Sequence, residues 1–162
     1  MLKKWKNFYI GIWDTAGQEK YSRISTYYCK GSQAAILTYD MTNRKSFEDL
    51  SKFVSFLKEA EKDCYMVVVA TKYDLVMDNP HLQIVTDEEG RLFAKKYGAA
   101  FFVTSSKLGS NVPAVFDAIG YHCLAEKLAD INMLNNILDS SQSNLSSQQR
   151  PRRFTFPCCP VQ

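Results

Sequence analysis

Two apolar runs of strand length, at residues 34–40 and 65–70, constrain the fold of this chain more than any other feature. Neither run alternates regularly between apolar and polar residues, which is typical of strands buried on both faces. Between the two runs, Leu50, Phe53 and Leu57 recur at helical spacing. Strands that alternate with helices predict an α/β fold, with a mostly parallel sheet and helices on both of its faces.

The remaining elements follow from the same periodicities. They are a strand at 8–13, a short helix at 21–28, a loop around 79–80, a strand at 99–103 and a last helix from 112 to about 138. Ser46 is predicted to open the helix after the first run. Thr86 and Glu89 have the spacing of a capping box, and Gly98 is predicted to end the helix that they begin.

The composition of the 162 residues is that of a soluble globular protein, with 46% hydrophobic and 23% charged residues. A net charge of +3 is too small to argue for nucleic-acid binding, and we expect no nucleic-acid partner. We find no apolar stretch of membrane-spanning length and no signal peptide. Five irregularly spaced cysteines argue against a disulfide framework or a zinc site and favour a reducing, cytoplasmic setting.

The chain is predicted to consist of one domain, residues 1–138, and a tail, residues 139–162. The tail is rich in Ser, Gln and Asn and then carries Arg150, Arg152 and Arg153. Because so polar a segment buries little apolar area, we expect it to be disordered.

The string Trp13-Asp14-Thr15-Ala16-Gly17-Gln18-Glu19 follows the strand predicted at 8–13. A carboxylate and a bare backbone N–H at a strand end suit Mg²⁺ and a terminal phosphate, and Gln18 is placed to orient an attacking water. The string resembles the switch II motif of Ras-like small GTPases, and its leading Trp is typical of the Rab branch.

Two later strings also follow predicted strands. Thr71-Lys72-Tyr73-Asp74 resembles the N-K-x-D motif of the same family, with Thr71 in place of Asn. A carboxylate here accepts from the N1–H and exocyclic amine of guanine, a donor pair that adenine lacks. Thr104-Ser105-Ser106-Lys107 resembles the E-T-S-A-K loop, in which the backbone N–H at the position of Ser106 meets the guanine carbonyl.

Two further strings narrow the resemblance. Tyr27-Tyr28-Cys29-Lys30-Gly31 and Leu37-Thr38-Tyr39-Asp40 resemble segments of Rab proteins. Aromatic residues there also have a simpler interpretation, as packing against the sheet. The Thr in the guanine motif and the Thr-Ser-Ser-Lys loop hint at an atypical, autophagy-associated Rab subgroup.

The resemblance implies a Ras-like G domain, incomplete at its N-terminus, that binds GTP or GDP with Mg²⁺ and hydrolyses GTP in vesicle traffic. It implies that Gln18 positions water, that Asp14 holds Mg²⁺ through water and that Gly17 senses the γ-phosphate. It also implies that Asp74 and Lys72, with Thr71, Ser105, Ser106 and Lys107, form the guanine pocket. Effectors, an exchange factor and a GTPase-activating protein are the implied partners.

The G-x-x-x-x-G-K-S/T phosphate loop of this family does not occur in the sequence. We therefore expect the chain to correspond to the later part of such a domain and to be inactive alone. The alternative is a non-catalytic, prenylated interaction fragment, from a truncated isoform or an incomplete gene model. An unrelated flavodoxin-like binder would not explain the guanine motifs together with the cysteine ending.

The last residues, Cys158-Cys159-Pro160-Val161-Gln162, resemble the C-C-x-x ending of Rab proteins. This resemblance implies geranylgeranylation of Cys158 and Cys159 by a prenyltransferase acting with Rab escort protein. Two lipid chains give stable anchoring, and the three arginines would add attraction to an anionic leaflet. The expected location is the cytosolic face of endomembranes. An unmodified polar tail is the simpler alternative.

Overall fold

The computed structural model describes residues 2–5, 8–15 and 29–142. Its contacts divide the chain into two units, Met1–Ala125 and Glu126–Gln162, which we treat separately. The helix predicted at 21–28 lies outside the described residues, as does the tail from residue 143 onward. No helix in the described ranges has a stretch long and apolar enough to cross a bilayer.

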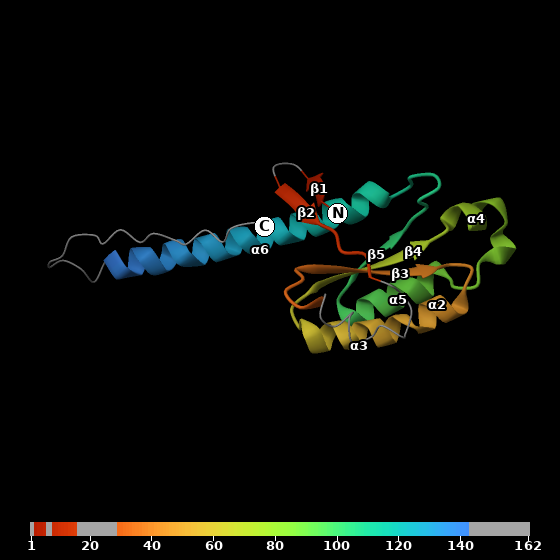
Figure 1. Cartoon of the computed structure of the whole chain (residues 1–162), viewed down its shortest axis with the longest axis horizontal. Coiled ribbons are helices and arrows are strands. Elements are labelled where there is room, and N and C mark those ends of the chain that lie inside the picture. Colours follow the sequence, from red (N-terminus) through yellow and green to blue (C-terminus); the bar gives the residue numbers. More distant parts are fainter. Residues whose placement is uncertain (1, 6–7, 16–28, 143–162) are drawn as a thin grey trace. The chain divides into compact units, whose positions relative to one another are not determined.

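A three-stranded parallel sheet forms the centre of the first unit (Figure 1). Its strands are β3 (Ala34–Asp40), β4 (Tyr65–Thr71) and β5 (Ala100–Val103), in that spatial order. β3 is in register with β4 along its whole length, from Ala34 opposite Tyr65 to Asp40 opposite Thr71. The parallel sheet predicted from the sequence is confirmed, and the carboxyl ends of its three strands lie on the same side of the sheet.

Helices cover both faces of this sheet. One face packs on α3 (Leu50–Ala60) and α5 (Asp87–Tyr97), which lie side by side below the strands in Figure 1. The other face packs on the first turns of α6 (Val112–Gln142), through Val115 and Ile119. Successive β4 residues alternate between the two faces, so Val68 joins the first core and Val67 the second. The predicted α/β arrangement of three layers, with the parallel sheet between two layers of helices, is thus present.

Local sequence signals explain the boundaries of α5. The Thr86 hydroxyl accepts from the Glu89 N–H, and the Glu89 carboxylate accepts from the Thr86 N–H, so the predicted capping box is formed. Gly98 has φ +68° and ends the helix in the left-handed conformation that glycine adopts most readily. Both predictions are confirmed.

The segment after β3 differs from its prediction. Asn43, not Ser46, caps α2 (Arg44–Glu48): the Asn43 side chain accepts from the Ser46 N–H. The hydroxyl of Ser46 instead donates to the Asn43 carbonyl at 2.8 Å. The expected single helix is divided at Asp49, whose carboxylate holds Lys45 at 2.8 Å and Lys52 at 3.0 Å.

Three further boundaries also differ. The expected loop contains α4 (Tyr73–Asp78) and a short 3₁₀ helix, η2 (Pro80–Leu82), which are too short for helical periodicity to reveal. The first predicted strand ends at Gly11 rather than Trp13, because its register with β1 ends at the Leu2–Gly11 pair. Finally, α6 runs to Gln142 instead of 138, since polar composition alone does not break a helix.

Strands β1 (Leu2–Trp5) and β2 (Phe8–Gly11) pair with each other in antiparallel orientation. Among the described residues they form a sheet of their own and share no strand pairing with β3–β5. Within the same residues β3 pairs only with β4, so its second edge carries no strand partner.

Candidate functional site

The two predicted base-binding loops meet where β4 and β5 end. The Thr104 N–H donates to the Ala70 carbonyl at 2.7 Å, and the Thr104 hydroxyl donates to the same oxygen at 3.1 Å. In return, the Tyr73 N–H donates to the Thr104 carbonyl at 3.2 Å. Because β4 and β5 are parallel, their carboxyl ends lie next to each other. These hydrogen bonds then hold the two loops against each other.

Asp74 is the acidic centre of this arrangement. It lies in the first turn of α4 and is only 6% exposed. The hydroxyl of Ser105, itself fully buried, donates to Asp74 Oδ1 at 2.6 Å. The ammonium of Lys107 lies 3.9 Å from Asp74 Oδ2. The structure therefore joins residues 31 positions apart in the sequence into one carboxylate site.

The surroundings of Asp74 keep its carboxyl group ionised. The hydrogen bond from Ser105 lowers the pKa of Asp74 most, followed by its own backbone N–H and the positive charges of Lys107 and Lys72. Burial acts in the opposite direction, but the pKa remains below its ordinary value. At neutral pH this side chain is a fixed hydrogen-bond acceptor with no proton to donate.

Lys72 connects β4 to α4 in an unusual backbone conformation. Its φ of 67° and ψ of 27° lie in the left-handed region, which only one other described non-glycine residue, Asn111, adopts. Such positions cost about 1–3 kcal/mol and gather at functional sites. The Lys72 side chain is exposed, and the turn at Lys72 leads directly into the first turn of α4, where Asp74 lies.

The Thr71 hydroxyl contributes to the fold. It donates to the Tyr39 carbonyl at 2.8 Å and so ties the end of β4 to β3. A Thr has only this one donor, whereas an Asn amide in the same place has two donors and an acceptor. The loop has correspondingly less capacity to reach other groups through residue 71.

Two residues that the sequence motifs did not identify, Ser110 and Asn111, hold the second loop in its conformation. The Ser105 N–H donates to the Ser110 carbonyl at 3.1 Å, which closes the loop on itself. The Asn111 side chain donates to the Val103 carbonyl at 2.9 Å, with Asn111 at φ 58° and Gly109 at φ 70°. Glycine and Asn so close together signal such a turn. Ser106 and Lys107, at its tip, are exposed.

The switch II residues are only partly described. Asp14 is exposed and follows β2, and within the described residues no hydrogen bond or ion pair joins it to the base-binding loops. Gly17 and Gln18 lie outside the described residues, as do the cysteines at 158 and 159. The structure therefore brings together Asp74, Ser105 and Lys107 but does not place the phosphate-side residues beside them.

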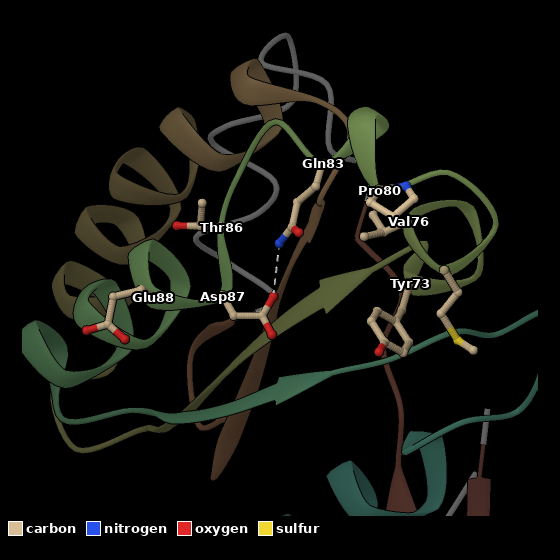
Figure 2. A pocket seen from close by; sticks show the side chains of 8 residues that line it. Tyr73, Val76, Pro80, Gln83, Thr86, Asp87 and Glu88 are labelled. Atoms are coloured by element: carbon tan, nitrogen blue, oxygen red, sulfur yellow. Dashed lines mark hydrogen bonds between the residues drawn. The ribbon is translucent and has the colours of Figure 1, made fainter.

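A separate open hollow of about 550 Å³ lies between α4 and the start of α5 (Figure 2). Tyr73, Val76 and Pro80 line one side of it, and Asp87 lines the other. The Asp87 carboxylate is engaged by the Gln83 amide at 3.1 Å, and Glu88 points away from the Tyr73 side. Asp74 does not line this hollow, which is therefore distinct from the carboxylate site.

Comparison with known proteins decides the family. The model of the Ras family matches residues 2–125, more than half of the chain. The chain belongs to the Ras family. Its match includes every element from β1 through the first turns of α6, and therefore both base-binding loops.

Several Ras-family relatives carry Rab-type names. The chain is 38% identical to "Ras-related protein Rab-24" of Dictyostelium discoideum over 68% of this chain and 54% of that protein. It is 35% identical to "Ras-related protein RABA2b" of Arabidopsis thaliana, over 82% and 67%. It is 32% identical to "Ras-related protein RabQ" of Dictyostelium discoideum, over 93% and 72%. These relatives place the chain in the Rab branch of the Ras family, and it spans from about half to seven tenths of their length.

Proposed function

We propose that this chain supplies the guanine-binding loops of a Rab-type GTP-binding switch that acts in vesicle traffic. The observation that carries the proposal is the buried Asp74 carboxylate, which the Ser105 hydroxyl holds at 2.6 Å. An ionised, oriented acceptor at the carboxyl end of a parallel sheet is suited to a ligand with two adjacent donors.

Guanine has such a donor pair in its N1–H and exocyclic amine. A carboxylate offers about four lone-pair positions, so Asp74 can accept from Ser105 and still bind both donors. Adenine has no hydrogen on N1, and an unprotonated N1 facing a carboxylate would be repelled. Asp74 thus fits guanine and discriminates against adenine.

The other loop residues have supporting roles in this proposal. The Lys72 stem would lie along the base, and the Ser106 N–H would meet the guanine carbonyl. Lys107 would hold the loop near Asp74 through its charge, 3.9 Å away. Because the Thr71 hydroxyl donates its only hydrogen to the Tyr39 carbonyl, we expect weaker nucleotide retention than an Asn would give.

Phosphate chemistry in the whole protein is proposed from the family. Gln18 would orient the attacking water, Gly17 would sense the γ-phosphate and Asp14 would hold Mg²⁺ through water. The described residues contain no group of three His, Cys, Asp or Glu side chains that could hold a metal. Mg²⁺ commonly uses one or two carboxylates together with nucleotide phosphates, and a lone Asp14 fits that pattern.

Membrane attachment is also part of the proposal. Geranylgeranylation of Cys158 and Cys159, through Rab escort protein and a prenyltransferase, would anchor the protein to the cytosolic face of endomembranes. An exchange factor, a GTPase-activating protein and effectors would complete the cycle. The autophagy-associated subgroup is proposed from Thr71 and the Thr104-Ser105-Ser106-Lys107 loop alone.

The test uses nucleosides, which need no phosphate-binding loop. The ¹⁵N-labelled chain is titrated with guanosine and, separately, with adenosine, and amide shifts are followed by NMR. Two hydrogen bonds to a charged group are worth about 1.5–3 kcal/mol each, so we expect guanosine to bind at least about tenfold more tightly. The shifts should centre on Asp74 and Ser106.

Equal binding of the two nucleosides by the folded chain would contradict the proposal. So would no binding of guanosine, because the described loops would then not form a base site alone. The second result would favour an interaction fragment without nucleotide, the alternative role for this chain.

A further inference from the structure

The part of α6 from Glu126 onward exposes large apolar side chains. Leu128 is 51% exposed, Ile131 52%, Leu134 59% and Met133 65%. Residues of these types are usually buried, and isolated exposed ones are common, but four exposed within seven positions of one helix are an unusual concentration.

Three of these side chains share one face of the helix. At about 100° per residue, Leu128, Ile131 and Leu134 lie within roughly 120° of one another around the axis. Met133 lies on roughly the opposite side. The exposed surface is therefore a stripe, which we call the α6 stripe and define as Leu128, Ile131, Leu134 and Asn135.

The spacing within the α6 stripe is that of a coiled coil. Residues 128, 131 and 135 are separated by three and then four positions, and the sequence continues with Leu138 three positions later. This is the a-d-a-d order of a heptad, with Leu134 at the flanking g position. Asn135 occupies an a position, where a single Asn typically sets register and two-stranded pairing at some expense of stability.

Charge favours a protein partner over a lipid surface. Glu126 and Asp130 lie outside the stripe, and Lys127, which flanks the stripe beside Leu134, is the only cation of residues 126–136. Helices that lie on membranes usually present Lys and Arg, because the cytoplasmic leaflet is anionic. In a parallel pair, Lys127 at a g position would face Asn132 at an e position of the second helix, so no like charges meet.

We propose that the α6 stripe pairs with the same stripe of a second copy of this chain, as a short parallel coiled coil in which the two Asn135 side chains face each other. The parallel, in-register arrangement follows because only it places Asn135 opposite Asn135; an antiparallel pair would set each Asn against an apolar position.

The area available makes this dimer weak. Complete burial of a Leu or Ile side chain removes roughly 60–120 Å² of apolar surface, so three from each helix give about 400–700 Å². Stable specific interfaces bury about 1,200 Å² or more. The pairing should therefore depend strongly on protein concentration.

Sedimentation equilibrium of the full 162-residue chain, without lipid, tests the proposal. The average mass should rise with concentration toward that of two copies. Leu128→Asp should lower the association constant at least about tenfold, because it places two charges in the paired seam. Met133→Asp, on the opposite side of the same helix, should leave it unchanged. Far-UV circular dichroism checks that both variants stay folded.

A second matched pair tests the register. Asn135→Leu should strengthen association and allow species larger than a dimer, whereas Asn136→Leu, one position outside the stripe, should not. Equal effects within either pair would overturn the proposal, since they would indicate unspecific adhesion. A chain that stays monomeric at every concentration would also overturn it. If that monomer binds neutral phosphatidylcholine vesicles through Leu128, the stripe is a lipid surface.

Discussion

The hydroxyl of Tyr39 lies inside the core between β3 and α5 and has no hydrogen-bond partner among the described residues. Burial raises the pKa of Tyr39, and the nearby carboxylates of Asp87 and Glu89 raise it further, so the hydroxyl stays protonated. A buried polar group without a partner costs about 1–3 kcal/mol. The Tyr39 ring still stabilises the fold, since it packs edge-on against the Phe47 ring with centroids 5.0 Å apart.

Removing this hydroxyl should not harm the protein. We expect Tyr39→Phe to be neutral or to raise the free energy of unfolding by up to about 1 kcal/mol, because the ring stays and the unsatisfied group goes. Urea denaturation followed by circular dichroism measures the change. A loss of more than about 1 kcal/mol would show that the hydroxyl has a partner within the folded chain.

Gly90 on α5 is the close neighbour of the same hydroxyl. A Cβ at position 90 would overlap the Tyr39 hydroxyl and stand 2.5 Å from a ring carbon of Phe101. Gly90→Ala should therefore destabilise the fold by about 1–3 kcal/mol, despite the better helix propensity of Ala. Glu88→Ala, exposed on the same helix, is the control and should change little. A stabilised Gly90→Ala variant would contradict this packing.

At the level of single residues, the sequence identifies Asp74, Ser105 and Lys107 through family motifs. It does not show their geometry. The hydrogen bond between Ser105 and Asp74 spans 31 positions and depends on the register of β4 with β5, which no local pattern encodes. The left-handed turn at Lys72 was equally unpredictable, because Lys rarely adopts positive φ.

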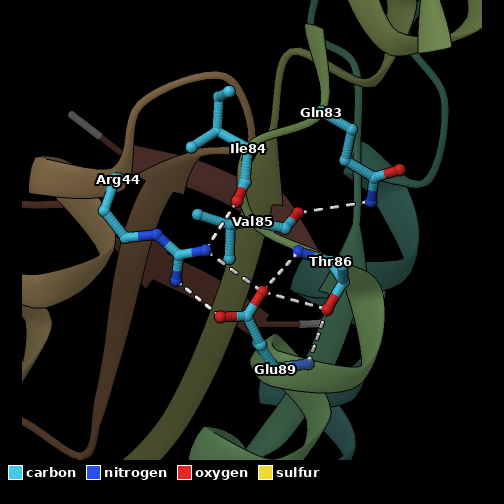
Figure 3. Close-up of polar contacts among 6 residues, drawn as sticks. All are labelled: Arg44, Gln83, Ile84, Val85, Thr86 and Glu89. Carbon is cyan, nitrogen blue, oxygen red and sulfur yellow. Dashed lines mark hydrogen bonds and ion pairs between the residues drawn. The ribbon is translucent and has the colours of Figure 1, made fainter. Parts of the chain in front are cut away.

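The secondary-structure elements are held to one another by a few polar contacts as well as by the apolar core. Arg44, at the start of α2, reaches across to Glu89 on α5 and to the Ile84 carbonyl, at 2.5 Å and 2.6 Å (Figure 3). Glu89 also accepts from the Thr86 N–H at 2.9 Å, so one carboxylate caps a helix and joins two elements. Elements whose ends depend on neighbours in sequence, such as α5, were predicted well. Elements whose ends depend on distant contacts, such as α4, were not: the Tyr73 N–H bonds to the Thr104 carbonyl.

The Glu89 carboxylate should make the stability of the fold depend on pH. The Arg44 hydrogen bond, followed by the Thr86 N–H, lowers the pKa of Glu89 from 4.5 to about 2. A lowered pKa in the folded state stabilises the fold fully above pH 4.5, and this stabilisation is lost as the pH falls toward 2. Because the two side chains are 40% and 38% exposed, solvent screens the pair, and we expect about 1 kcal/mol or less at pH 7.

Comparing Glu89→Gln with the wild type measures how much the ionised Glu89 carboxylate stabilises the fold, since Gln can keep the capping box but not the charge. The difference in free energy of unfolding should be largest near neutral pH and shrink as the pH approaches 3. Glu88→Gln is the matched control for the removal of an exposed acidic charge from the same turn of α5. A Glu89→Gln difference that is the same at pH 7 and pH 3 would rule out an ionised Glu89 as its origin.

For the whole molecule, the central question is how stability is distributed over the sheet. β4 lies between β3 and β5, and its Val67 and Val68 are fully buried. β3 has a strand partner on one side only among the described residues, and its Ile36 is 37% exposed. An edge strand leaves every second backbone N–H without a partner strand.

Hydrogen exchange followed by NMR tests this distribution. Amides of β4 should exchange most slowly, close to the rate of global unfolding, while alternate amides of β3 should exchange at least about a hundredfold faster. Uniform protection along β3, equal to that of β4, would mean that a further strand pairs with its second edge. That result would correct the three-stranded description of the sheet.

The most direct test of the guanine site is the base preference of Asp74→Asn, compared with that of the wild type. Asn replaces one acceptor with a donor, so it matches xanthine, which has a carbonyl where guanine has its exocyclic amine. In parallel NMR titrations we predict that the wild type prefers guanosine and that Asp74→Asn prefers xanthosine. If the substitution leaves guanosine the preferred base, Asp74 does not read the base, and the guanine site assigned to these loops is wrong.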